Sequence, residues 1–153
     1  MISKSTIESD IYSLIYSRMR NTITSVTLSD SSVVGVQTYT STFPDYEQDS
    51  ESDYPVLVVN PIEMKWTQFT ITRKQVEGTF LIDLYATKAE AADKLRQAII
   101  ESIETYRPDL KELGMDFVML DGVENDDATR GAFKVHVRSC RFNFMWRFTE
   151  TRV

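Results

Sequence analysis

The chain has 153 residues, of which 42% are hydrophobic and 26% charged, and its formal net charge is −6. This length and composition predict one globular domain over residues 1–153. No apolar run reaches the ~20 residues that span a bilayer, and the N-terminus has no secretory signal pattern. A single cysteine excludes an internal disulfide and points either to a reducing compartment or to a fold that is indifferent to the redox state of its compartment. The acidic balance argues against nucleic-acid binding as the main task, since phosphate contacts need a basic surface.

The first predicted element is an amphipathic helix from about Thr6 to Arg20. Ser5 and Glu8 have the spacing of a capping box in front of it. Its apolar positions recur at steps of three and four and form one narrow stripe, namely Ile7, Ile11, Leu14, Ile15 and Met19. A loop rich in Ser and Thr follows, and residues 33–36 are expected to form a short edge strand.

Residues 39–54 differ in composition from the rest of the chain, because acids and small polar residues almost replace aliphatic ones. Tyr46, Glu47, Asp49 and Glu51 are typical of the segment. So few apolar side chains favour a flexible, solvated acidic loop. Two alternatives stay open: a calcium loop, although the mid-loop glycine and final glutamate of an EF-hand are missing, and a docking loop that orders against a partner subunit.

Residues 54–59 form a short apolar run that predicts a buried strand, and residues 62–76 predict a projecting hairpin arm. The arm is rich in aromatic and β-branched residues but has no cleanly apolar face. Its apolar side chains are covered either by another copy of the chain or by the edge of the monomer's own core. The candidate subunit or tube contacts on the arm are Trp66, Phe69, Ile71 and Arg73.

Residues 76–106 predict the centre of the fold. The even positions of a strand over 76–86 are all small or apolar, which places one face of this strand against the core. Thr87 and Glu90 have capping-box spacing and predict the start of the longest helix. The apolar stripe of this helix consists of Leu95, Ala98, Ile99, Ile103 and Tyr106, and Pro108 is expected to stop it.

The C-terminal third predicts strands separated by turns. Residues 108–114 fit a short helical turn closed by a glycine, residues 117–120 a strand, and residues 121–131 a polar turn region. Residues 132–148 predict an unusually long strand. Its apolar positions change from odd to even near Arg138 and Ser139, which predicts a β-bulge there.

The sequence contains no motif for catalysis, a cofactor or a metal. Nucleophile elbows, zinc-protease motifs, phosphate loops and C-x-x-C pairs are all missing. His136 and Cys140 are separated by about 13 Å along a strand at ~3.3 Å per residue, which is too far for a nucleophile–base pair. Cys140 is interpreted as a small core residue. We therefore expect no enzymatic activity.

These elements predict an α+β fold in which an N-terminal helix and one long central helix pack on a mixed or mainly antiparallel sheet with an extended β-hairpin. The order of elements, with the segments 54–59, 77–95 and 142–148, resembles the tail terminator proteins (tail completion or head–tail joining proteins) of long-tailed bacteriophages. The resemblance covers most of the chain and is strongest from about residue 54 to residue 148.

The resemblance implies a structural virion protein, made in the host cytoplasm, that forms a homohexameric ring at the head-proximal end of the tail tube. Such a ring stops tube polymerisation, contacts the tail tube protein and a neck or head-closure protein, and lets DNA pass through its lumen without specific binding. Neither a cofactor nor a membrane is implied. Two alternatives stay open: another neck, head-closure or tail component of the same lineage, and a small cytoplasmic ferredoxin-like binding domain.

Overall fold

The computed structural model describes residues 7–40, 54–68, 73–130 and 133–149. In these ranges the chain forms two helices and a mixed, mostly antiparallel sheet, so the predicted α+β fold is confirmed. The elements in order are α1 (Ile7–Thr22), β1 (Ser25–Thr27), β2 (Val33–Gly35), β3 (Gln37–Thr40), β4 (Val56–Val59), β5 (Glu63–Gln68), β6 (Arg73–Ala86), α2 (Ala89–Glu112), β7 (Met115–Arg130) and β8 (Phe133–Thr149).

The main sheet has the strand order β3-β4-β6-β8-β7, and β5 pairs with β6 beside this path. β3 and β4 run parallel, whereas all other pairs of this sheet are antiparallel. β4 and β5 share one edge of β6: β4 pairs with residues 82–85 and β5 with residues 74–79. β1 and β2 form a separate antiparallel pair.

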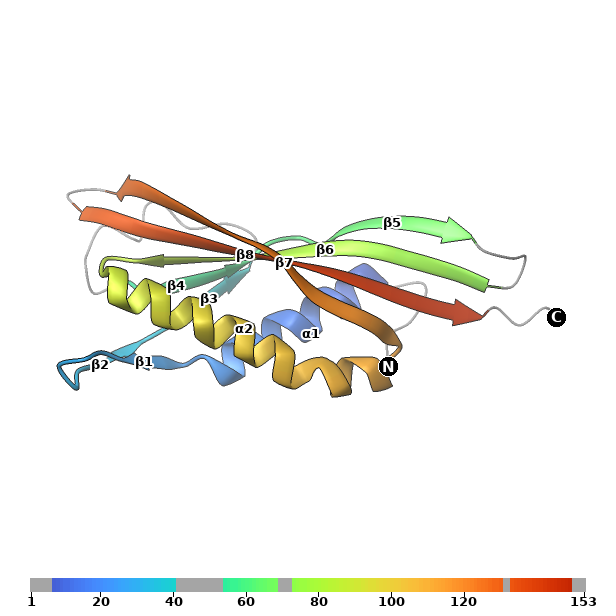
Figure 1. The fold of residues 1–153 in the computed structure, drawn as a ribbon, viewed down its shortest axis with the longest axis horizontal. Coiled ribbons are helices and arrows are strands. Elements are labelled where there is room, and N and C mark those ends of the chain that lie inside the picture. Colours follow the sequence, from blue (N-terminus) through green and yellow to red (C-terminus); the bar gives the residue numbers. More distant parts are fainter. Residues whose placement is uncertain (1–6, 41–53, 69–72, 131–132, 150–153) are drawn as a thin grey trace.

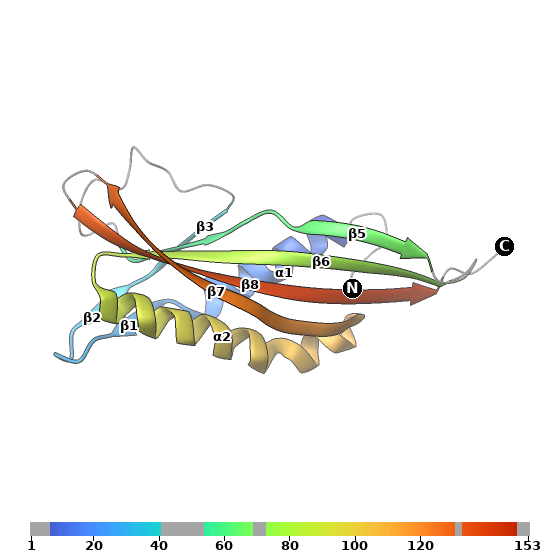
Figure 2. The ribbon, with the colours of Figure 1, turned by 45° about the horizontal axis from the view of Figure 1, so that its top comes forward.

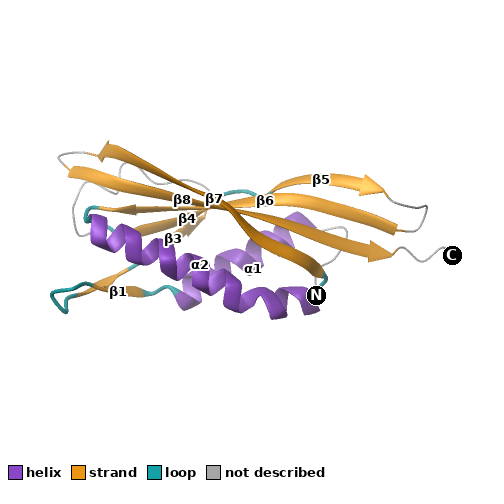
Figure 3. Ribbon diagram, viewed as in Figure 1, coloured by secondary structure: helices purple, strands orange, loops and turns teal. Residues whose placement is uncertain are grey.

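Both helices lie on the same side of the sheet (Figures 1 and 3). The even positions of β6 face them as predicted, with Phe80, Ile82 and Leu84 fully buried. The Phe80 ring stacks on that of Phe142 of β8 at a centroid distance of 5.0 Å. Each large apolar side chain buried in this way contributes roughly 1.5–3 kcal/mol to folding. The helices supply the other half of this core with Ile7, Ile11, Ile15 and Met19 from α1 and Leu95, Ile99, Ile103 and Leu110 from α2.

A polar contact joins the two helices beside this core. The Arg18 guanidinium donates to the carbonyl and hydroxyl oxygens of Ser102 at 3.2–3.4 Å, and it lies 4.9 Å from the centroid of the Tyr106 ring. The Thr22 and Ser102 hydroxyls are 2.8 Å apart. Because the nearly buried Ser102 is hydrogen-bonded, it does not leave an unsatisfied group between the helices.

The segment between β4 and β5 is hydrogen-bonded to β6. The Asn60 backbone N–H donates to the Leu81 carbonyl at 3.0 Å, and its side-chain amide donates to the same carbonyl at 3.2 Å and to Asp83 at 2.8 Å. β5 then pairs with β6 as an antiparallel hairpin in which Gln68 pairs with Lys74. The hairpin and the C-terminal end of β8 extend past both helices in Figures 1 and 2.

The termini of the long helix differ from the prediction. Lys88, not Thr87, is the N-cap residue, and no side chain caps the helix. The Glu90 carboxylate instead accepts hydrogen bonds from the backbone and hydroxyl of Ser29, which tie the helix to the segment between β1 and β2. A tertiary contact has therefore replaced the local capping box.

Pro108 lies inside α2 and does not end it. A proline removes one backbone hydrogen bond, but Leu110 beyond it is fully buried, so packing carries the helix one turn further. The helix ends at Glu112, and Gly114 after it has a φ of +106°. A Cβ atom at this glycine would lie 2.2 Å from the Trp146 indole nitrogen, so the close approach of β8 also requires glycine.

Residues 121–130, predicted as a turn region, belong to the long strand β7. The predicted bulge at Arg138 and Ser139 is also wrong, because β8 pairs with β6 without interruption from His136 to Thr149. The register shifts lie on β7 instead, between Met115 and Phe117 and between Leu120 and Gly122. The change of phase in β8 has another cause: Val135 is buried on the face away from the helices, whereas Cys140 and its even-numbered successors are buried beneath them.

The fold predicts that Gly78 cannot be replaced by alanine without cost. An alanine Cβ would lie 2.3 Å from Cζ of the Phe144 ring and 2.6 Å from the Glu63 carbonyl oxygen. We expect Gly78→Ala to lower the free energy of unfolding by about 1–3 kcal/mol in urea titrations. Gly35→Ala is the matched control, since nothing lies within 4 Å of its Cβ position, and its effect is expected to stay within about 0.5 kcal/mol. Equal stabilities of the two variants would contradict this packing.

Candidate interaction surfaces

Of the residues predicted to contact other subunits, Trp66 is the one whose side chain the structure describes. It lies on β5, is 45% exposed, and pairs with the buried Val76 of β6. Arg73 begins β6, where its backbone pairs with Thr149. Phe69 and Ile71 of the arm, and Tyr46, Glu47, Asp49 and Glu51 of the acidic loop, lie outside the described residues. Tyr39 and Thr40, assigned to that loop from sequence, belong to β3.

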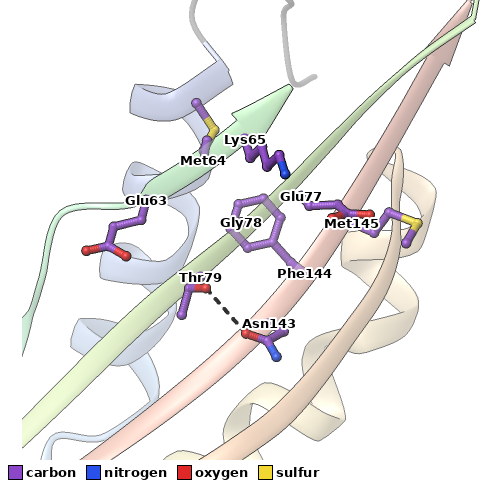
Figure 4. A pocket seen from close by; sticks show the side chains of 9 residues that line it. All are labelled: Glu63, Met64, Lys65, Glu77, Gly78, Thr79, Asn143, Phe144 and Met145. Carbon is purple, nitrogen blue, oxygen red and sulfur yellow. Dashed lines mark hydrogen bonds between the residues drawn. The ribbon is translucent and has the colours of Figure 1, made fainter. Parts of the chain in front are cut away.

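We call the face of the sheet that points away from the helices the outer face. Above Gly78 it is hollowed to about 510 Å³, and both polar and apolar side chains line this hollow (Figure 4). The Thr79 hydroxyl donates to the Asn143 side chain at 3.3 Å, and Lys65 lies near Glu77 of the paired strand β6. The hollow is lined by Glu63, Met64, Lys65, Glu77, Gly78, Thr79, Asn143, Phe144 and Met145.

A half-buried carboxylate lies further along the outer face. Asp83 accepts hydrogen bonds from the Asn60 amide at 2.8 Å and from the Ser139 hydroxyl at 2.5 Å. Burial raises the pKa of the neighbouring Tyr85 hydroxyl, and the negative charge of Asp83 adds to this effect. These hydrogen bonds join the segment after β4 to β6 and β8.

The two long edges of the sheet carry most of its exposed apolar side chains. In the described part of the chain the large exposed hydrophobic residues are Val33, Trp66, Met119 and Val123. Trp66 lies on β5 and the last two lie on β7. β5 and β7 each pair with one strand only within the described ranges, so each has an edge whose backbone groups are not used by the sheet. We call them the β5 edge (Glu63–Gln68) and the β7 edge (Met115–Arg130).

The sequence analysis missed the β7 edge, since it assigned Val123 to a polar turn. The length of the following predicted strand, residues 132–148, was a signal for a neighbouring strand. A strand as long as residues 132–148 needs an antiparallel neighbour of similar length to use its backbone hydrogen bonds. Residues 115–130 are the adjacent segment that can supply one through a short connection, despite their many acids.

Cys140 and His136 both lie on β8, four residues apart. Cys140 is fully buried, so its prediction as a core residue is confirmed. Burial raises the pKa of its thiol to about 11. A thiol of this kind is protonated at neutral pH and is a poor nucleophile.

Within the described ranges no cluster of three or more His, Cys, Asp or Glu side chains has metal-binding geometry. In the same ranges neither helix combines the length and the apolar character that crossing a membrane requires. Comparisons with protein-family models and with curated protein sequences find no match for this chain. The edges and the outer face are thus the features from which a function can be argued.

The buried thiol predicts a pH dependence of stability. Because the pKa is about 11 in the folded protein and 9.0 ordinarily, the unfolded chain loses the thiol proton first as the pH rises. The native state therefore binds more protons between pH 9 and 11, and the free energy of unfolding falls there by at most about 1.4 kcal/mol per pH unit.

Urea titrations from pH 8 to 11 check this expectation. Cys140→Ala is expected to be less stable at pH 8 but to lose less stability as the pH rises. Tyr85 and Tyr106, whose pKa values burial also raises, are present in both proteins, so the difference isolates the thiol. Parallel pH profiles for the two proteins would contradict the assignment.

Proposed function

We propose that this chain is a structural virion protein, a tail terminator that forms a ring at the head-proximal end of a phage tail tube. In this role it stops tube polymerisation and joins the tail to the neck. The observation that carries the proposal is the extension of the sheet beyond its helices, together with the edge strands β5 and β7. Such an extension offers backbone groups and the exposed Trp66 to other subunits.

The order of the elements supports the proposal further. An N-terminal helix, a hairpin that leads into the central strand, a long helix and a long C-terminal strand follow one another, which is the order on which the resemblance to the family rests. The proposed partners are therefore other copies of the chain, the tail tube protein and a neck or head-closure protein.

Charge is consistent with a ring around DNA. Each copy carries a formal net charge of −6, so six copies carry −36. A negative lumen repels phosphates and lets DNA pass without being held. DNA exit slowed by basic residues lining the lumen would contradict this part of the proposal.

A head-closure or other neck component remains the second candidate, since it differs only in what binds to each face of the ring. A ferredoxin-like binding domain is less well supported. Its β-α-β-β-α-β order differs from the observed order, in which one helix precedes all strands and six strands separate the two helices.

The proposal predicts a ring in solution or at the end of a tail tube. Light scattering of the purified protein is expected to give about six times the monomer mass of 17.7 kDa, with rings in negative-stain images. If the protein is monomeric alone, purified tail tubes are expected to acquire one cap each and to stop elongating. A stable dimer that leaves tube elongation unchanged would contradict the proposal.

A further inference from the structure

The two sheet edges differ in charge. The β7 edge contains five acidic residues and one basic residue, a net charge of −4. The β5 edge contains one acidic and one basic residue, Glu63 and Lys65, and has no net charge. The charged residues of the β7 edge are Asp116, Asp121, Glu124, Asp126, Asp127 and Arg130.

Each edge also combines an exposed apolar side chain with an exposed charge. Trp66 is 45% exposed and adjoins the exposed Lys65 on the β5 edge. Val123 is 37% exposed and adjoins the exposed Glu124 on the β7 edge, where Met119 is 49% exposed. The two edges are therefore complementary. Each has an exposed apolar side chain that the other edge can cover, and the charges beside these side chains, Lys65 and Glu124, have opposite signs.

We propose that the β5 edge of one copy pairs with the β7 edge of the next, so that the sheets of neighbouring subunits continue into one another. This inference rests on the ring of the proposed function and names the surfaces that build it. Pairing of two unlike surfaces is a heterologous contact, and repetition of such a contact closes a ring when the rotation allows it.

Charge decides against the symmetric alternative. Two β7 edges would bring together two strands of net charge −4, and like charges opposite one another destabilise a strand pair. Acids on an edge strand are also a common protection against unspecific pairing. A second β7 edge is thus disfavoured, whereas the β5 edge has no net charge and offers the exposed Lys65 to the acids of the β7 edge.

The direction of the strands fits this pairing. β5 and β8 both run antiparallel to β6, and β7 runs antiparallel to β8, so β5 and β7 run in opposite directions. Neighbouring subunits of a ring are related by a rotation, so their strands keep these directions, as in a β-barrel. β5 of one subunit therefore runs antiparallel to β7 of the next. Trp66 shares the helix side of the sheet with Val123, since the two pair with the buried Val76 and Cys140, whereas Met119 pairs with Asn143 of the outer face. Trp66 lies level with Met115 across the sheet, through Val76 and Trp146, so a contact with Val123 needs tilted strands, which closed β-barrels have.

Cysteine cross-linking tests the pairing, and the buried native thiol leaves the background clean. Trp66→Cys, Met119→Cys and Val123→Cys are prepared separately and treated with a short bis-maleimide. We expect cross-linked dimers when Trp66→Cys is mixed with Val123→Cys, fewer with Met119→Cys, which lies on the opposite face of the sheet, and none from any variant alone. Dimers from Val123→Cys alone would overturn the proposal in favour of symmetric pairing.

Light scattering of the same samples separates this inference from the proposed function. Rings without a cross-link in either mixture would overturn the edge pairing and leave the ring intact. Cross-links accompanied by open filaments would support the edge pairing and overturn the ring. A lack of both, with tail tubes present, would overturn both.

Charge reversal provides the second test. Lys65→Glu and Glu124→Lys are each expected to raise the concentration needed for half-assembly by about tenfold or more, and combining them is expected to recover part of this loss. Glu104→Lys, an equal charge change on an exposed position of α2, is the control and is expected to leave assembly unchanged. Circular dichroism verifies that every variant is folded. Assembly that is insensitive to both single reversals would overturn the proposal.

Discussion

The antiparallel pairing of β6 with β8 is the constraint on which the rest of the structure depends. It runs without a register shift from Arg73 and Thr149 to Ala86 and His136. β4 and β5 pair with β6, β7 pairs with β8, and β3 joins the sheet through β4. The pairing places Phe80 beside Phe142 and Gly78 beside Phe144, which creates the apolar surface that both helices cover. A slip of one residue would turn this surface to the outer face, so the two strands are tightly specified.

The helices cover only part of this sheet, and that division separates buried from exposed residues. Beneath the helices the side chains are apolar and buried, as with Ile82 and Cys140. On the outer face the same strands carry Asp83, Ser139 and Arg141, and the edges carry Trp66 and Val123. A monomer whose sheet is longer than its helical layer has stable strands at its ends only if the central pairing is strong enough to support them.

The sequence predicted the centre of this fold well and its margins poorly. The period-two pattern over residues 76–86 and the helical stripe through Leu95 and Ile103 were strong because one face of each element packs in the core. Local signals failed where tertiary contacts outweighed them: Glu90 binds Ser29, and Leu110 holds the helix beyond Pro108. The β7 edge was missed because an exposed, acidic edge strand has the composition of a turn. Its exposed apolar residues, Met119 and Val123, can be assigned to an edge of the sheet only once the order of the strands is known.

The unbroken ladder also determines how the projecting end responds to force. A pull along the hairpin acts parallel to β6 and β8, so it loads their backbone hydrogen bonds in shear and many of them must break together. A pull across the sheet at the β7 edge would instead open one pair at a time. The extension is therefore mechanically anisotropic: it is stiff along its strands and can be peeled from its side. In the proposed role, in which the chain joins the tail to the neck, the extension would resist force best when the force acts along its strands.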